Sequence, residues 1–306
     1  MSGIFRDVYI LKRAKSRILD YKVIPTINVL DKEGKISVEI LSTIGNPNIK
    51  YTLINPNNDK ISSGNIENNN LQIDIKDIEL WSAESPSLYT LLLETENEVI
   101  KERIGMREVK IENAVLKINN VPIKLKGVNH HDSSPTKGYV VAYDDLILDL
   151  KLMKECNINS IRASHYPKSP IFYELCDEYG FYVMNEADIE THGVVELYGK
   201  GYLDNYNMIA DDKIYENVII DRIDSSIVPF KNRSCIFMWS LGNESGFGVN
   251  FESGAKYAKE LDTTRPVHYE GAYYASKERK NDFSNLDVIS RMYPSLEEIE
   301  DYLKMV

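Results

Sequence analysis

The segment CIFMWSLGNESG, residues 235–246, decides how the second part of this sequence folds. It begins with an unbroken apolar run and ends in a loop that holds two glycines and Glu244. Such a run is typical of a strand that is buried on both faces of a parallel sheet. The polar residues that follow it would lie at the carboxyl end of the strand, where sites form in α/β barrels. We therefore predict a buried parallel strand that leads into a candidate site.

Similar short apolar runs occur on both sides of this strand and alternate with segments of helical pattern. The expected strands are PIKLKGV (122–128), NSIRAS (159–164), FYVMNE (181–186), CIFMWSL (235–241), PVHYEG (266–271) and DVISRMY (287–293). This alternation is typical of a parallel sheet covered by helices. A closed (β/α)8 barrel has eight such units. We predict that residues 108–306 form an incomplete (β/α)8 TIM barrel.

Capping residues place the expected helices. One helix should start at Asp144 or Asp145 as N-cap and place Leu146, Leu150 and Met153 on one face. A second has Ser169 as N-cap, proline at its first position and a glycine, residue 180, just past its end. A third is expected over residues 251–261.

The first part of the sequence has a different rhythm. The runs KISVEI (35–40), LQIDIK (71–76) and LYTLLLE (88–94) lie between turn-forming segments at residues 31–34, 57–59 and 68–70. Alternation with a period of two, broken by such turns, is typical of an antiparallel sandwich. We predict an immunoglobulin-like, all-β domain over residues 1–107. The fold class is therefore multidomain, a sandwich followed by a barrel.

Composition excludes several classes of partner. The net charge of −11 offers no basic stripe for phosphates, so we expect no nucleic acid partner and no anionic membrane partner. No apolar run approaches the roughly 20 residues of a membrane span. Three widely spaced cysteines argue against a disulfide framework and favour a reducing, cytoplasmic location.

Polar side chains follow the expected strands and form the candidate site. Glu244 could stay protonated at a barrel mouth and act as a general acid, although a surface glutamate in a glycine-rich loop is the alternative. Glu190 and His192 could bind a divalent cation together with Glu244, although a hydrogen-bonded loop is the more common structure for this pattern. His131 and His165 could contact sugar hydroxyls or be packing histidines. For Trp239 we favour a place in the barrel core.

Motifs along nearly the whole chain resemble those of glycoside hydrolase family 2 β-galactosidases. They are SGIFRDVYIL (2–11), LWSAESPSLY (80–89), GVNHHDSSP (127–135), IRASHYP (161–167), NEADIETHG (185–193), FMWSLGNESG (237–246), RPVHYEG (265–271) and RMYPS (291–295). The ETHG segment is more similar to galactosidases than to glucuronidases or mannosidases of the family.

The resemblance implies a retaining mechanism in which two glutamates lie about 5 to 5.5 Å apart. By matching motif positions, Glu244 is expected to be the acid/base. Glu190 and His192 are expected to bind magnesium with Glu244. The remaining roles are substrate binding or site ordering by His131, Arg162, His165 and Asn243, and hydrogen bonding to the nucleophile by Tyr293.

The sequence also departs from the family pattern. The family nucleophile lies on a strand resembling ILCEY, expected after RMYPS, and no such strand occurs in the 306 residues. Neither Glu186 nor Glu270 replaces it convincingly. The N-terminal sugar-binding jelly roll is absent as well. Three positions carry a different residue from the one usual in the family. Arginine is usual at the position of His130, glutamate at that of Asp132 and asparagine at that of Asp188.

We therefore expect the parent polypeptide to cleave terminal β-galactosides such as lactose with retention, and this chain alone to be nearly inactive. The full-length protein is expected to be a homo-oligomer, and no organic cofactor is expected. One alternative is a non-catalytic carbohydrate-binding or assembly fragment. Another is a family 2 enzyme that acts on β-glucuronides or β-mannosides.

Overall fold

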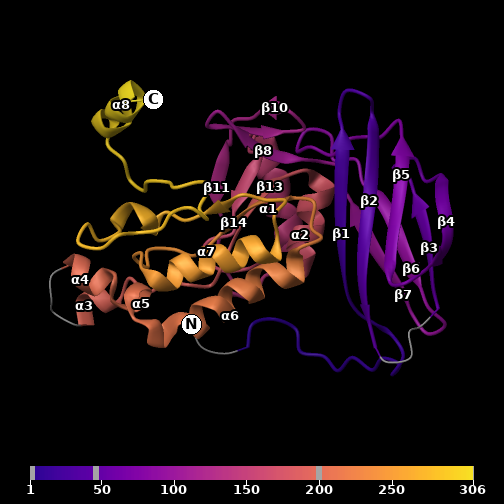
Figure 1. Ribbon diagram of the computed structural model, residues 1–306, viewed down its shortest axis with the longest axis horizontal. Helices are drawn as coiled ribbons and strands as arrows, with labels where there is room; N and C mark the ends of the chain where they lie inside the picture. Colours follow the sequence, from indigo (N-terminus) through magenta and orange to yellow (C-terminus); the bar gives the residue numbers. More distant parts are fainter. Residues whose placement is uncertain (1–3, 44–47, 198–201, 306) are drawn as a thin grey trace. The chain divides into compact units, whose positions relative to one another are not determined.

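The computed structural model describes residues 4–43, 48–197 and 202–305 (Figure 1). The chain divides into two compact units, which we describe separately. The first unit contains residues 1–185 and 228–237, and the second contains residues 186–227 and 238–306. The first unit groups the N-terminal sandwich with the first strands of the parallel sheet. This division into units therefore does not test the domain boundary predicted between residues 107 and 108.

The sandwich of the first unit consists of two antiparallel sheets, as predicted. One sheet has the order β1-β2-β5 and the other β4-β3-β6-β7. The strands are β1 (Ile18–Asn28), β2 (Glu33–Ser42), β3 (Ile49–Ile54), β4 (Lys60–Ile66), β5 (Asn70–Lys76), β6 (Tyr89–Glu94) and β7 (Val99–Ile104). The expected strands KISVEI, LQIDIK and LYTLLLE correspond to β2, β5 and β6.

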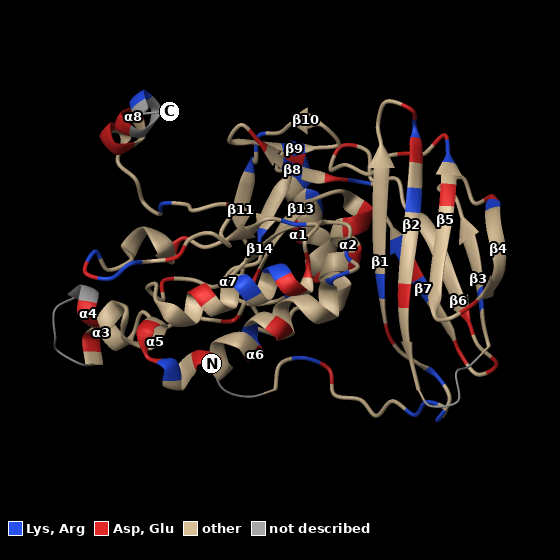
Figure 2. Ribbon diagram, in the orientation of Figure 1, with Lys and Arg blue, Asp and Glu red and all other residues tan. Residues whose placement is uncertain are grey.

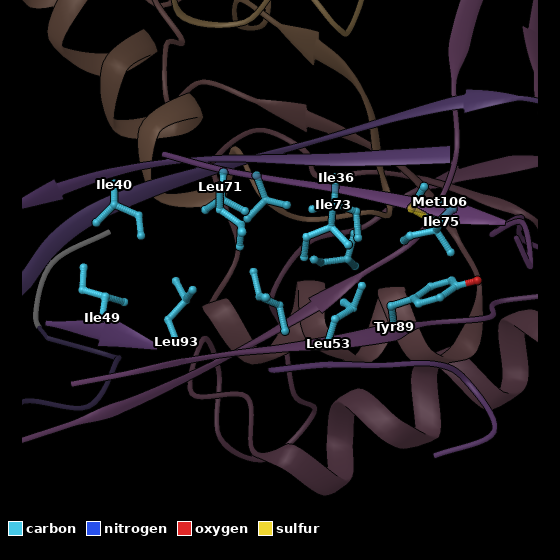
Figure 3. Packing of buried hydrophobic residues seen from close by; sticks show 14 of the residues in the cluster. Ile36, Ile40, Ile49, Leu53, Leu71, Ile73, Ile75, Tyr89, Leu93 and Met106 are labelled. Atoms are coloured by element: carbon cyan, nitrogen blue, oxygen red, sulfur yellow. The ribbon is translucent and has the colours of Figure 1, made fainter. Parts of the chain in front are cut away.

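Alternate residues of these strands form the sandwich core. Figure 3 shows Ile36 and Ile73 on one sheet pointing toward Leu53 and Leu93 on the other. Ile36, Leu53 and Leu93 are fully buried. The predicted turns are confirmed as well, since Lys32, Asn58, Asn68 and Asn69 adopt positive φ angles. Polar residues that tolerate this conformation thus separate the strands.

Buried charges join the sandwich to the barrel segments inside the first unit. Glu102 on β7 is 2% exposed, pairs with Arg233 and accepts a hydrogen bond from Tyr21 Oη at 2.6 Å. Arg233 Nη1 also lies 3.6 Å from Asp177 Oδ2. Desolvation raises the pKa of Glu102 and raises the pKa of Asp177 to about 6. Nothing in the sequence pattern indicated this cluster.

The barrel segments form a parallel sheet with the order β11-β12-β13-β14-β15. Neighbouring strands of this sheet are joined by backbone hydrogen bonds or β-pairing between residues of the same unit. The strands are β11 (Gly127–Asn129), β12 (Ser160–Arg162), β13 (Tyr182–Glu186), β14 (Ile236–Ser240) and β15 (Val267–His268). A small antiparallel sheet of β8 (Val109–Glu112), β9 (Val115–Ile118) and β10 (Val121–Pro122) precedes them. The sheet with its helices is the predicted incomplete barrel.

All six expected strands of the parallel sheet are shorter than predicted, and PVHYEG gives only the two residues of β15. Only the last residues of PIKLKGV enter the sheet, in β11. In DVISRMY only Val288 forms a β-bridge, to His268. The short β15 offers this segment few backbone groups to pair with, so the ladder does not extend.

The helices of the first unit follow their capping signals in part. In α2 (Pro170–Tyr179), Ser169 is the N-cap and Gly180 adopts φ +77° just past the end, as predicted. The N-cap of α1 (Tyr143–Glu155) is Ala142 and not an aspartate. Asp145 instead sits in the first turn and accepts the Ala142 N–H at 2.9 Å. It therefore caps from inside the helix.

In the second unit, α6 (Glu216–Ile227) and α7 (Val249–Leu261) lie side by side (Figure 1). The expected helix 251–261 is thus confirmed and starts two residues earlier. The other helices are α3 (Val194–Leu197), α4 (Tyr202–Tyr206), α5 (Met208–Asp211) and α8 (Leu296–Met305), with short 3-10 turns η1 (Lys213–Tyr215), η2 (Val228–Phe230) and η3 (Gly271–Tyr274). Of these, η2 belongs to the first unit.

Charges of both signs are mixed along the elements. Figure 2 shows Lys and Arg interspersed with Asp and Glu on β2 and on α7. Within the described residues, no helix is both long and apolar enough to cross a bilayer. The three cysteines are free thiols, with Cys176 and Cys235 buried.

Candidate active site

Apart from Tyr293, the predicted site residues fall into two groups, one in each unit. The histidine group, in the first unit, contains His131, Arg162 and His165. The carboxylate group, in the second unit, contains Glu190, His192, Asn243 and Glu244. Each group follows strand ends of the parallel sheet, as the sequence predicted. That the two groups share one pocket remains a prediction.

The two histidines of the first group lie against each other. The ring centroids of His131 and His165 are 5.2 Å apart, in an edge-to-face arrangement. Arg162 Nη1 lies 3.5 Å from Asn129 Oδ1, and both residues line a cavity of about 180 Å³ beside β11 and β12. The group therefore presents imidazole and guanidinium donors of the kind that bind sugar hydroxyls.

A buried lysine lies near the two histidines. Lys168 is fully buried, donates from Nζ to Ser164 O at 3.0 Å and lies 3.8 Å from the centre of the Tyr166 ring. Partial desolvation, together with the nearby His165 and Lys168 side chains, lowers the pKa of His131. The imidazole is therefore neutral near pH 7 and can both donate and accept. A lysine in a loop is usually exposed, so the sequence pattern does not predict this contact.

Two of the residues that depart from the family pattern have structural partners. His130 is buried, stacks on Phe172 with ring centroids 5.2 Å apart, and has Nε2 3.2 Å from Asp149 Oδ2. Burial lowers its pKa. Asp188 forms an ion pair with Arg222 at 2.6 Å.

The carboxylate group forms where the segments after β13 and β14 run side by side. The Asn243 N–H donates to Ile189 O at 2.9 Å, and Asn243 forms a parallel bridge with Glu190. The Asn243 side-chain amide donates to Glu190 Oε2, and the His192 N–H lies 3.3 Å from Glu190 Oε1. Asn243 and Glu190 are therefore brought together, as expected of residues on one site.

Glu244 occupies a sharp loop between two glycines. Gly242 has φ +148°, Glu244 has φ +40° and Gly246 has φ +67°. A positive φ is unfavourable for glutamate and is found mainly where neighbouring structure enforces it. The side chain of Glu244 is half-buried. Such a strained, partly shielded carboxylate after a buried strand fits a catalytic group better than a surface residue.

Sequence reasoning missed a buried polar network around this loop. Glu270, which is 1% exposed, accepts the Glu244 N–H through Oε1 at 2.5 Å. Glu186 accepts from Ser240 Oγ at 2.8 Å, and this hydroxyl lies 3.0 Å from His268 Nδ1. Glu186, Ser240 and Glu270 each lie at or just after the end of a strand, which is a signal that could have grouped them.

The residues expected to bind magnesium are not arranged as a metal site. Among the described residues, no three His, Cys, Asp or Glu side chains are grouped so that they could hold an ion. The Glu190 carboxylate is already engaged by Asn243 and by the His192 backbone. Magnesium binding by Glu190, His192 and Glu244 therefore stays a prediction.

Two further residues have clear environments. Tyr293, expected to contact the nucleophile, is 87% exposed, so its role stays a prediction. Trp239 is 1% exposed and donates from Nε1 to Asp262 Oδ2 at 2.9 Å. The core position favoured for Trp239 is thus confirmed.

Solved structures share this fold. A Ruminococcus gnavus β-glucuronidase matches 95% of this chain and 52% of its own with a TM-score of 0.78 at 20% identity. A Bacteroides uniformis β-glucuronidase matches 85% of this chain and 33% of its own with a TM-score of 0.71 at 21% identity. At these identities the likeness concerns the fold alone.

Sequence comparisons give closer relatives. A β-galactosidase of Staphylococcus xylosus is 52% identical over 98% of this chain, and one of Actinobacillus pleuropneumoniae is 42% identical over 99%. The chain spans about 30% of the length of these relatives. The family described as "Glycosyl hydrolases family 2" matches residues 13–107, and its "TIM barrel domain" matches residues 109–306. The chain therefore belongs to glycosyl hydrolase family 2.

Proposed function

We propose that the protein carrying this chain hydrolyses terminal β-galactosides, such as lactose, with retention of configuration. The proposal is carried by one observation: the half-buried Glu244 lies in a strained loop after a buried strand, in a chain 52% identical to a β-galactosidase. Retaining hydrolysis requires one carboxyl group that protonates the glycosidic oxygen and a second that attacks the anomeric carbon.

In this proposal Glu244 is the acid/base. It gives its proton to the leaving oxygen and then takes one from water. Asn243 orders the loop by its side-chain contact with Glu190. His131, Arg162 and His165 bind galactose hydroxyls, and Tyr293 contacts the nucleophile.

Neither buried glutamate of the second unit is proposed as the nucleophile. Glu270 is engaged by the Glu244 backbone, and Glu186 accepts from Ser240. We propose that the nucleophile is supplied by sequence that matches the rest of the relatives' length. Without it the covalent step is lost, so this chain alone should be nearly inactive.

The first experiment measures o-nitrophenyl β-galactoside hydrolysis. One sample is the 306-residue chain, and the other is a chimera in which it replaces the matching segment of the Staphylococcus xylosus β-galactosidase. We expect an active chimera, a nearly inactive chain, and loss of activity in the Glu244→Gln chimera. Robust turnover by the chain alone would overturn the nucleophile assignment. An active Glu244→Gln chimera would overturn the acid/base assignment.

Substrate and location need separate tests. A panel of aryl galactosides, glucuronides and mannosides on the chimera decides the sugar, and preference for a glucuronide would contradict the proposal. Calorimetric titration of the chain with galactose, with and without magnesium, tests the binding-fragment alternative and the metal. The free thiols support a reducing, cytoplasmic location. Light scattering of the full-length protein tests the expected homo-oligomer.

A further inference from the structure

We infer that Glu270 is a positioning residue that holds Glu244 in its reactive conformation. The inference rests on the proposed role of Glu244. The Glu270 side chain is directed at the backbone of Glu244, where Oε1 lies 2.5 Å from the amide nitrogen. The bond is made at the residue whose φ angle is +40°.

Burial makes this hydrogen bond effective. Glu270 is 1% exposed, so water competes poorly for its oxygen. A hydrogen bond from a backbone N–H to a carboxylate is roughly twice as strong as one between neutral groups. Glutamate at φ +40° needs such a local constraint, because relaxation to a negative φ would turn its side chain away.

The backbone of the segment after β15 also lies close to the backbone of the loop that holds Glu244. A Cβ atom on Gly271 would lie 2.7 Å from Gly246 O. Only a glycine therefore lets the segment after β15 approach the loop of Glu244 this closely. The Tyr273 N–H donates to Glu270 O at 3.0 Å, at the start of η3. This hydrogen bond helps to fix the backbone of Glu270.

This geometry separates positioning from direct catalysis. A general acid must meet the leaving oxygen at hydrogen-bond distance, and small misplacements are costly. Losing Glu270 should therefore impair the step that needs protonation, and spare substrates whose leaving group departs unprotonated. A purely structural role would affect both kinds of substrate alike.

Hydrogen exchange tests the constraint on the chain itself. In Glu270→Ala, we expect the amides of residues 243–246 to exchange at least about tenfold faster, as loss of a charge-assisted hydrogen bond implies. Glu270→Gln keeps an acceptor oxygen and should show a smaller increase. The control is Asp262→Asn, since Asp262 is also 1% exposed and bonds Trp239 outside this loop. Unchanged exchange in Glu270→Ala, or an equal change in the control, would overturn the inference.

Kinetics in the chimera test the consequence. We expect Glu270→Ala to lower kcat/KM about a hundredfold for lactose and less than about threefold for dinitrophenyl β-galactoside, which leaves without a proton. Asp262→Asn should change both alike. An equal loss on both substrates in Glu270→Ala would overturn the positioning role. A chimera inactive on every galactoside would instead refute the proposed function, and the exchange experiment would still decide the constraint.

Discussion

Substituting Gly242 by alanine should destabilise the second unit strongly. Gly242 has φ +148°, a conformation that is nearly restricted to glycine. A Cβ atom there would lie 2.9 Å from both the carbonyl oxygen and the Cβ of Ile189. Because one of these atoms belongs to the backbone, rotation of a side chain cannot relieve the overlap.

Two terms set the size of the effect. Holding a non-glycine residue in this region costs about 1–3 kcal/mol. Relieving the overlap requires the segments after β13 and β14 to separate, and such overpacking costs about 1–3 kcal/mol more. We therefore expect Gly242→Ala to lower the free energy of unfolding by about 2–6 kcal/mol.

Urea unfolding provides the measurement. Circular dichroism and tryptophan fluorescence are followed together, because coincident curves are needed for a two-state free energy. Trp239 lies in β14, just before the substituted residue. The matched control is Gly193→Ala, since a Cβ at the exposed Gly193 would meet nothing within 4 Å. A difference below about 0.5 kcal/mol between the variants would refute this reasoning.

Three further predictions concern the first unit. Arg233→Met should cost about 3–5 kcal/mol at pH 7, because it leaves the buried Glu102 and Asp177 carboxylates without their cation; urea unfolding with an unchanged midpoint would contradict this. Burial raises the pKa of Asp177 from 3.8 to about 6, so the folded chain holds this proton more tightly than the unfolded chain. The wild type should therefore lose about 3 kcal/mol relative to Asp177→Asn as pH rises from about 3 to about 7, and a constant difference across this range would be the contrary result. Leu53→Ala, at a fully buried position of the sandwich core, should cost about 2–5 kcal/mol, whereas Leu41→Ala, which is 60% exposed, should cost little, as thermal unfolding can show.

Local signals predicted local structure well. The Ser169-Pro170 start of α2 and its Gly180 end are confirmed, because each signal acts through the backbone of its own neighbours. The alternating strands and asparagine turns of the sandwich are confirmed for the same reason. The predicted start of α1 was wrong by two or three residues, since an aspartate can cap a helix either from the N-cap or from within the first turn, as Asp145 does.

The sequence predicts only those features of the candidate site that follow from the position of a residue along the chain. The motif around Glu244 predicts that this carboxylate is the acid/base, which stays a prediction. The strand-end rule predicts that Asn243 lies near Glu190, and the structure shows the two side chains in contact. Neither indicated that Glu270 holds the Glu244 backbone, because that contact depends on two loops 26 residues apart meeting at hydrogen-bond distance. From its position in the sequence, Glu270 is considered only as a nucleophile, a role that does not suit its engaged carboxylate. A buried glutamate near an active site therefore has to be assigned by what its oxygens accept, and only a three-dimensional structure supplies that information.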